Sequence, residues 1–263
     1  MNGNRRLDDQ RKRDDMDKAF RAKRNEFIYR SFRDVADCDY IAARLNHRAG
    51  LYDQFLWSAL QAVEKYIKTI LLIYDKKTQH IGHDLPKGIR YIELIPDIHW
   101  DFDDKMKKFL EFLFIYGGDR YSSFPRGTMG DELFVLDSVI WKIRRYCQDL
   151  ELLKKPSINL YINYLKTIQS KKCIEEANKF RLLHRGYIER VLDTKSFLKQ
   201  RECLVYKNFY FGTNKKHRIK YNFSITGSTP VYKHFPEIIP WIKNRVKISP
   251  LANYCMEMIS KKP

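Results

Sequence analysis

The stretch LYDQFLWSALQAVEKYIKTILLIYD, residues 51–75, decides the fold class. Its apolar side chains return at steps of three and four residues, which places them on one side of an α-helix. One row consists of Leu51, Phe55, Ala59, Val63, Tyr66, Ile70 and Tyr74, and a second row of Leu56, Leu60, Ile67 and Leu71 widens it. Beside these rows, Glu64 and Lys68 are spaced to form an ion pair within the helix. The stretch predicts a long helix whose apolar face other helices must cover.

Two shorter helices are predicted on either side of it. The segment ADCDYIAARL, residues 36–45, shows helical spacing with Asp37 and Asp39 as capping candidates. After the long helix, Asp84 is placed to cap a helix that starts near Pro86, because proline is favoured in a first turn. Both predictions put an aspartate at a helix N-terminus.

Two more amphipathic segments follow, at 103–117 and 130–153. Gly117 and Gly118 should end the first of them, and Asp131 is a candidate cap for the second. Short connections between long amphipathic helices are typical of antiparallel bundles. The expected fold class is therefore mainly α.

The pattern changes toward the end of the chain. Helical spacing continues to about residue 192, but 203–227 alternates in the manner of strands around a polar GTNKKH turn, with Val205, Phe209 and Phe211 before it and Ile219, Tyr221, Phe223 and Ile225 after it. This predicts a basic β-hairpin. The expected domains are a charged helical arm (1–34), a helical bundle (35–155) and a C-terminal extension with helices and the hairpin (156–263).

The chain carries a formal net charge of +18 over 263 residues. Such a field attracts polyanions, which makes RNA, DNA, nucleotides or an acidic protein reasonable partners. The other interpretation is a basic protein whose lysines only solvate its surface. Charge favours nucleic acid or nucleotide contact without deciding between the two.

The five cysteines are widely spaced and include no CxxC pair, so they predict neither a zinc site nor a disulfide framework. We expect reduced thiols, no metal and no cofactor. The N-terminus has no apolar signal segment, and no apolar run approaches the roughly 20 residues of a membrane span. A cytoplasmic protein without membrane contact is expected.

Five blocks of the sequence resemble the HEPN domain family: ADCDYIAARL, QFLWSALQAVEKYIKTILL, HDL, DRYSSFPRG and LDSVIWKIRRYC. Their order and spacing extend over residues 35–150. HEPN domains are small helical bundles found in prokaryotic toxin–antitoxin pairs, phage-defence systems and CRISPR effectors. The resemblance implies a HEPN-like antiparallel bundle and a homodimer formed through it. It also implies RNA or a nucleotide as ligand and allows a protein partner that is encoded by a neighbouring gene.

The resemblance also bears on catalysis. Many HEPN domains are metal-independent ribonucleases in which a histidine follows an arginine by four to six residues. In this chain Arg120 has no histidine at that spacing, and Arg44 and Arg181 each precede one by three residues. Two functions stay open: an RNA-binding toxin or defence protein with a divergent ribonuclease site, or a non-catalytic nucleotide-binding or adaptor protein that partners an enzyme such as a nucleotidyltransferase.

The stretch GGDRYSSFPRG is the candidate anion site. Arg120 and Tyr121 match the Arg-Tyr block of the HEPN branch that travels with nucleotidyltransferases. Arg120 and Arg126 precede a predicted helix N-terminus, where free amides and the helix dipole favour a phosphate. In the other interpretation, Arg120 pairs with an acid such as Asp119 or Glu64 and only stabilises the bundle.

The sequence HIGHD places His80 near His83, but one such pair in a polar loop is weak evidence for a metal site. One interpretation has Asp84 capping the next helix while His83 packs against the bundle. If the chain is catalytic, His83 and Arg120 are the candidate catalytic residues. Histidine exchanges protons near neutral pH, and arginine binds phosphate while staying charged.

The predicted hairpin is the second candidate for RNA contact. Lys215, Lys216 and Arg218 lie in or beside its turn, with aromatic residues such as Tyr206 and Tyr221 nearby. Basic and aromatic side chains together suit single-stranded nucleic acid, because bases stack and phosphates meet cations. The alternative is a sheet with one buried aromatic face and a solvated basic turn.

Overall fold

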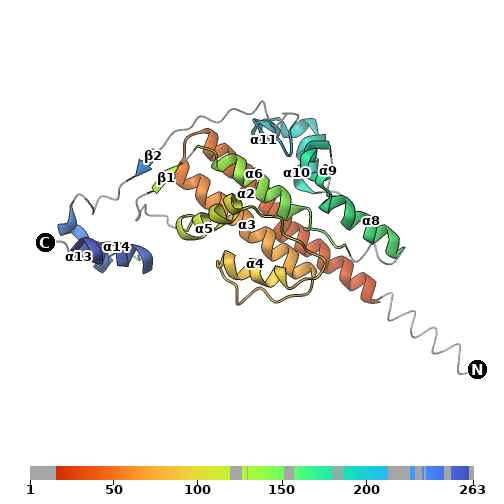
Figure 1. Cartoon of the computed structure of the whole chain (residues 1–263), viewed down its shortest axis with the longest axis horizontal. Coiled ribbons are helices and arrows are strands. Elements are labelled where there is room, and N and C mark those ends of the chain that lie inside the picture. The colour runs from red at the N-terminus through yellow and green to blue at the C-terminus, as the bar shows by residue number, and fades with distance from the viewer. Residues whose placement is uncertain are drawn as a thin grey trace, which may run out of the picture.

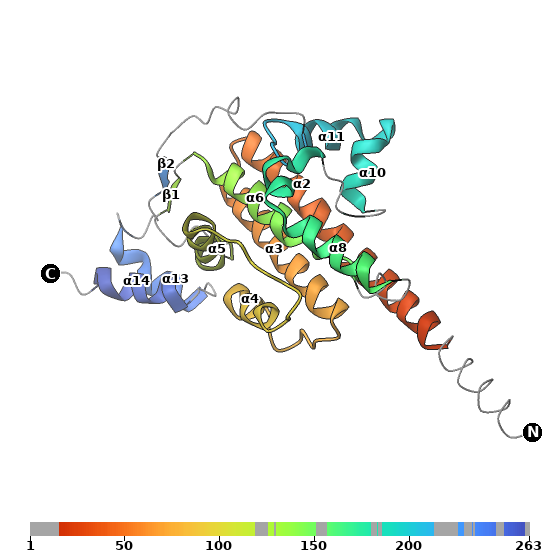
Figure 2. The same ribbon diagram turned by 45° about the vertical axis from the view of Figure 1, so that its right-hand side comes forward.

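The computed structural model describes residues 16–118, 126–128, 130–150, 157–179, 183, 186–212, 226–228, 233, 235–245 and 250–260. Over these residues the fold is almost entirely helical, which confirms the mainly α class (Figures 1 and 2). The helices are α2 (Asp34–Arg48), α3 (Tyr52–Ile73), α4 (Leu85–Glu93), α5 (Asp104–Tyr116), α6 (Glu132–Arg144), α8 (Ile158–Gln169), α9 (Lys171–Glu175), α10 (Tyr187–Asp193), α11 (Leu198–Val205), α13 (Ile239–Arg245) and α14 (Pro250–Ser260). Two short strands, β1 (Arg126–Thr128) and β2 (Thr226–Ser228), pair antiparallel.

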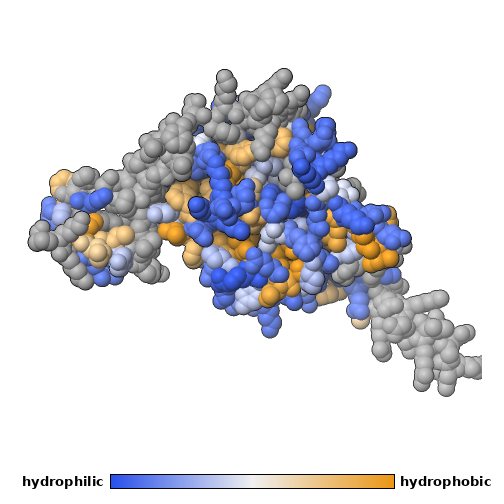
Figure 3. All heavy atoms as spheres, viewed as in Figure 1, coloured by the Kyte–Doolittle hydropathy of each residue, from blue (hydrophilic) through white to orange (hydrophobic). Residues whose placement is uncertain are grey.

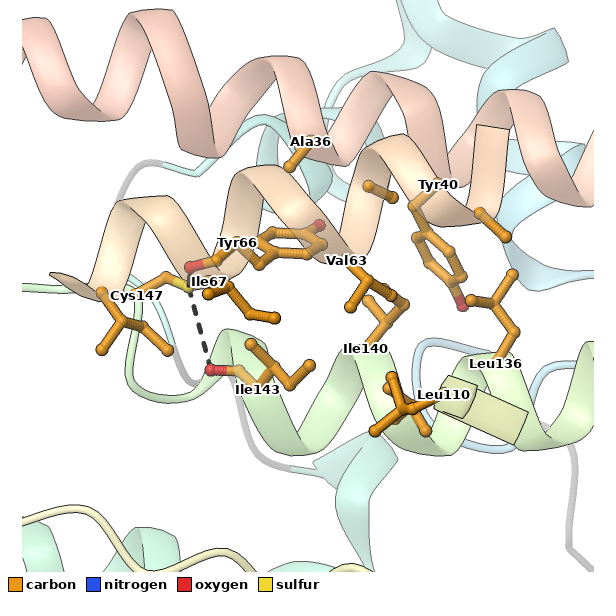
Figure 4. Packing of buried hydrophobic residues seen from close by; sticks show 14 of the residues in the cluster. Ala36, Tyr40, Val63, Tyr66, Ile67, Leu110, Leu136, Ile140, Ile143 and Cys147 are labelled. Atoms are coloured by element: carbon orange, nitrogen blue, oxygen red, sulfur yellow. Dashed lines mark hydrogen bonds between the residues drawn. The ribbon is translucent and has the colours of Figure 1, made fainter. Parts of the chain in front are cut away.

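Helix α3 is the centre of the bundle, as its broad apolar face predicts. Helix α2 lies along it, and α4, α5 and α6 also contact it (Figure 1). In Figure 4, Tyr40 of α2, Val63 and Tyr66 of α3 and Ile140 of α6 belong to one apolar core, and all four are fully buried. Because each buried aliphatic side chain contributes about 1.5–3 kcal/mol, this core dominates the stability of the bundle.

The charged N-terminal arm runs into the bundle without a break. Residues 16–28 are helical, Tyr29–Arg33 form a π-helical turn, and α2 follows directly. Asp149 fastens this helix, because its carboxylate accepts hydrogen bonds from Arg21 Nε and Asn25 Nδ2, both at 2.6 Å. The helix predicted for this charged segment is therefore present in its described part and is tied to the end of the bundle.

The helix termini bear out some predicted caps. Asp84 caps α4, since its carboxylate accepts a hydrogen bond from the Lys87 N–H at 2.8 Å, and this confirms the prediction. Asp131 precedes α6 as expected but makes no capping bond with its side chain. Its carboxylate instead forms an ion pair with Lys105 of α5. Gly117 follows the last residue of α5, as predicted.

The capping role predicted for Asp37 and Asp39 is wrong, because both lie inside α2, which begins at Asp34. Helical residues precede α2, so its first N–H groups need no side-chain cap. Asp37 is fully buried, and its carboxylate accepts hydrogen bonds from Arg144 at 2.7 and 2.8 Å and from the Ile188 N–H at 3.0 Å. It also accepts a hydrogen bond from the Tyr66 hydroxyl, so one carboxylate joins α2, α3, α6 and α10.

The first strand of the predicted β-hairpin is absent. Val205 ends α11, and the turns after it bury Phe209 and Tyr210 against α6. The fully buried Asn208 holds these turns, because its Oδ1 accepts a hydrogen bond from the Tyr210 N–H at 2.9 Å. Residues 213–225, which contain most of the second predicted strand, lie outside the described residues.

Helices α13 and α14 form a small core of their own around Ile239 and Met256. Figure 1 shows them at the end of the molecule opposite the N-terminal helix. On the surface, apolar side chains gather on α8 (Figure 3), where Ile158 and Leu160 are 55% and 53% exposed. None of the described helices has the length and apolar character that crossing a lipid bilayer requires.

Candidate functional site

His83 is the one predicted site residue whose side chain falls within the described part of the chain. The others lie outside it: Arg120, Tyr121, Lys215, Lys216 and Arg218 entirely, and Arg126 in its side chain, although its backbone begins β1. The anion site expected near Arg120 therefore stays a prediction from sequence.

His83 lies in the turn between α3 and α4, directly before the capping residue Asp84. Its side chain is 77% exposed, so it does not pack into the bundle as one interpretation of the sequence had it. Its Nδ1 lies 2.7 Å from Oε2 of Glu64, a residue of α3. The imidazole is thus open to solvent on one side and held by a carboxylate on the other.

Glu64 also binds Lys68, which lies one turn further along α3. The Lys68 Nζ is 2.5 Å from Oε1 of Glu64, which confirms the predicted ion pair. The Glu64 side chain is only 7% exposed, so its carboxylate is shielded and gains from having two partners. Lys65, which directly follows Glu64, binds Asp39 instead, with its Nζ 2.5 Å from the carboxylate.

This arrangement suits proton transfer. A neutral imidazole that donates its Nδ1–H to Glu64 keeps the lone pair of Nε2 free to accept a proton, and the carboxylate then stabilises the imidazolium that forms. The Lys68 ammonium adds a second cationic group beside the same carboxylate. The Glu64–Lys68 spacing was visible in the sequence, whereas the contact of Glu64 with His83 depends on how the turn folds back on α3.

Arg44, which precedes His47 by three residues, is unavailable for RNA. It is buried in an ion pair with Asp137, and its Nε donates to the Cys203 carbonyl at 3.0 Å. His47 packs edge-on against Phe55, with ring centroids 4.9 Å apart, and burial lowers its pKa. Arg44 is therefore buried in the bundle, and His47 is partly buried beside it.

The described residues include no group of three His, Cys, Asp or Glu side chains placed to hold a metal ion. His80 lies in the same turn as His83, but its ring packs edge-on against Tyr91, with centroids 4.9 Å apart. All five cysteines are free thiols. Comparison with protein-family models, curated proteins and solved structures gives no match to this chain.

Proposed function

We propose that the chain is a HEPN-type RNA-binding protein of a prokaryotic toxin or defence system that cleaves RNA without a metal, with His83 as the proton carrier. The observation that carries the proposal is the 2.7 Å hydrogen bond between the exposed His83 imidazole and the buried Glu64 carboxylate. The open face leaves Nε2 of the imidazole within reach of a substrate. The net charge of +18 supports RNA as the substrate.

In the proposed reaction, Nε2 of His83 removes the proton of a ribose 2′-hydroxyl. The 2′-oxygen attacks phosphorus, the bond to the 5′-oxygen breaks, and a 2′,3′-cyclic phosphate forms. The proton passes from the imidazolium to the leaving 5′-oxygen, so protons balance. The Lys68 ammonium and, by the sequence resemblance, the Arg120 guanidinium stabilise the negative charge that gathers on the phosphate oxygens.

A second function, a non-catalytic nucleotide-binding or adaptor protein that partners an enzyme, is favoured by one observation. Arg120 is not followed by a histidine at the spacing typical of HEPN ribonucleases. The guanidinium of Arg44 is already paired with Asp137. Under this alternative, RNA or nucleotide binding remains and cleavage is absent. A homodimer through the bundle is part of both proposals by the same resemblance.

The two functions are separated by incubating the full chain with total RNA and tRNA in the presence of EDTA. Wild-type cleavage should survive chelation and fall about 100-fold or more in His83→Ala, because a positioned general base contributes about 10²–10⁴-fold. The matched control is His80→Ala, which removes an exposed imidazole from the same turn and should leave the rate unchanged. Cleavage by His83→Ala at the wild-type rate refutes His83 as the proton carrier. RNA that the wild type binds but leaves intact supports the adaptor function.

A further inference from the structure

A pocket of 340 Å³, which no sequence pattern predicts, opens between α4 and α5. Leu85, Ile89 and Leu110 form its apolar wall, and Trp100 and Phe102 line it from the connection between the two helices. Its volume lies at the lower end of the range of small-molecule sites, about 300–1,000 Å³. A single small molecule or one unit of a polymer fits such a volume.

The aromatic pair in this pocket has a specific geometry. The rings of Trp100 and Phe102 are stacked, with centroids 4.9 Å apart and planes 15° from parallel. Trp100 is held from the side by Tyr146, whose ring is edge-on to it at 5.9 Å. Both stacked residues line the pocket and are partly exposed, so a ligand can reach their rings. A stacked pair of this kind offers a planar ligand a rigid aromatic partner.

Four charged side chains complete the lining: Arg90, Glu93, Lys107 and Glu111. All four are exposed, and none forms an ion pair with another residue that the structure describes. This contrasts with Arg44, Arg144 and Arg145 of the bundle, whose guanidinium groups are all paired with carboxylates. Uncommitted cations and carboxylates around an aromatic wall are available to a ligand that carries both an anion and hydrogen-bond donors.

We propose that this pocket binds one nucleotide, with its base against the Trp100–Phe102 pair and its phosphate toward Arg90 and Lys107. Stacking on aromatic side chains recognises a base through its π face, and cations recognise the phosphate. Carboxylates such as Glu93 accept hydrogen bonds from ribose hydroxyls or the amino group of a base. A peptide lacks this combination of a planar ring and a strong anion on one small unit.

The pocket also lies next to the candidate proton carrier. Leu85 follows His83 by two residues, so their Cα atoms are within about 7 Å of each other. That the nucleotide is a unit of an RNA substrate rests on the proposed function, whereas nucleotide binding itself does not.

The test is isothermal titration of the full chain with AMP, adenosine and inorganic phosphate. AMP should bind, and Lys107→Gln and Arg90→Gln should each weaken it about tenfold, the loss of one charge-assisted contact. The affinity for adenosine should not change in Lys107→Gln, because the lost contact is to phosphate. Phe102→Leu should weaken AMP and adenosine alike.

Matched controls lie on α5 outside the pocket: Lys108→Gln for the charge and Phe114→Leu for the aromatic ring, both exposed in the wild type. Each should bind AMP like the wild type. No AMP binding at millimolar concentration, or equal losses in the controls, overturns the nucleotide pocket. A wild-type chain that binds AMP but leaves RNA intact keeps the pocket and refutes only the proposed cleavage.

An oligoribonucleotide distinguishes the two sources of the nucleotide. If the pocket serves an RNA strand, Phe102→Leu should raise the KM for cleavage while His83→Ala lowers kcat. If it serves a free nucleotide, RNA cleavage in Phe102→Leu should equal that of Phe114→Leu, and the RNA subsite is refuted.

Discussion

The two carboxylate oxygens of Glu64 bind different groups. Oε2 lies 2.7 Å from His83 Nδ1, and Oε1 lies 2.5 Å from Lys68 Nζ. In the proposed reaction Glu64 does not touch RNA, so it is a positioning residue. Its contribution should appear in the rate of the chemical step and leave the binding of RNA unchanged.

Glu64→Gln should therefore lower kcat about 100-fold and leave the KM for RNA within about twofold, because only the orientation and stabilisation of the imidazole are lost. The matched control is Asp39→Asn, which removes the carboxylate bound to the neighbouring Lys65 and should leave both constants unchanged. A Glu64→Gln enzyme with wild-type kcat would remove Glu64 from the mechanism. A melting curve of each variant checks that the bundle is intact.

His47 predicts how the stability of the bundle depends on pH. Burial lowers its pKa from the ordinary 6.5, with Glu132 opposing the shift and Arg44 adding to it. The folded state therefore binds fewer protons than the unfolded state, so this contribution is present above pH 6.5 and is lost as pH falls through the folded pKa.

Chemical denaturation between pH 7.5 and 5 should show the free energy of unfolding of the wild type falling more steeply than that of His47→Gln. One proton accounts for at most about 1.4 kcal/mol per pH unit. Parallel pH profiles of the two proteins would show that His47 is not held neutral. His99→Gln, which replaces an exposed histidine, is the control and should keep the wild-type slope.

At the level of elements, Asp37 of α2 is bound by three other helices, and one of its partners is the Tyr66 hydroxyl of α3. Asp37 also accepts from Arg144 of α6 and from the first turn of α10, and Arg144 in turn binds Glu189 at 2.7 Å. A buried charged side chain that loses its counter-charge lowers the free energy of unfolding. This ion pair is therefore one of the buried polar links between the bundle and the residues that follow it, beside the bonds of Arg44 to the Cys203 and Tyr206 carbonyls.

Asp37→Ala should destabilise the protein by about 3–5 kcal/mol, because it leaves the Arg144 guanidinium without one of its two carboxylates. Asp39→Ala, two residues away, removes only a partly exposed ion pair with Lys65 and should cost about 0–1 kcal/mol. Urea denaturation measures both. Equal destabilisation by the two variants would contradict the importance of the buried pair.

The helices α3, α4, α5 and α6 could be predicted from sequence, because amphipathic spacing and caps such as Asp84 are local signals. Two predictions failed where distant residues decide the outcome. Asp37 has the composition of a cap, but Arg144, more than 100 positions away, binds it inside a helix. The alternating aromatics around Phe209 resemble a strand, yet they form turns because α6 offers them a buried surface.

The candidate site could be predicted only in part. The HDL block identified His83, and the spacing in α3 identified the Glu64–Lys68 pair. The contact between Glu64 and His83 arises from a turn that folds back across 19 residues, for which no local pattern exists. The pocket between α4 and α5 was missed for the same reason, since its lining comes from three stretches, the two helices and the connection between them.

At the level of the whole molecule, the charge of +18 should govern RNA affinity. If RNA is bound through about four phosphate contacts, its affinity should fall about fifty-fold between 50 and 200 mM salt, since the logarithmic slope is about −0.7 per contact for single strands. Filter binding over a salt series measures the slope. An affinity that does not change with salt would contradict an electrostatic interface.

The central claim is that the imidazole of His83 carries the proton during RNA cleavage, and chemical rescue tests it most directly. His83 is 77% exposed, so free imidazole can reach the space left in His83→Ala. Cleavage of RNA by His83→Ala should be about 100-fold slower than wild type and should rise with added imidazole at constant pH and ionic strength. The wild type and His80→Ala should not respond. Undiminished cleavage by His83→Ala without imidazole would contradict the claim.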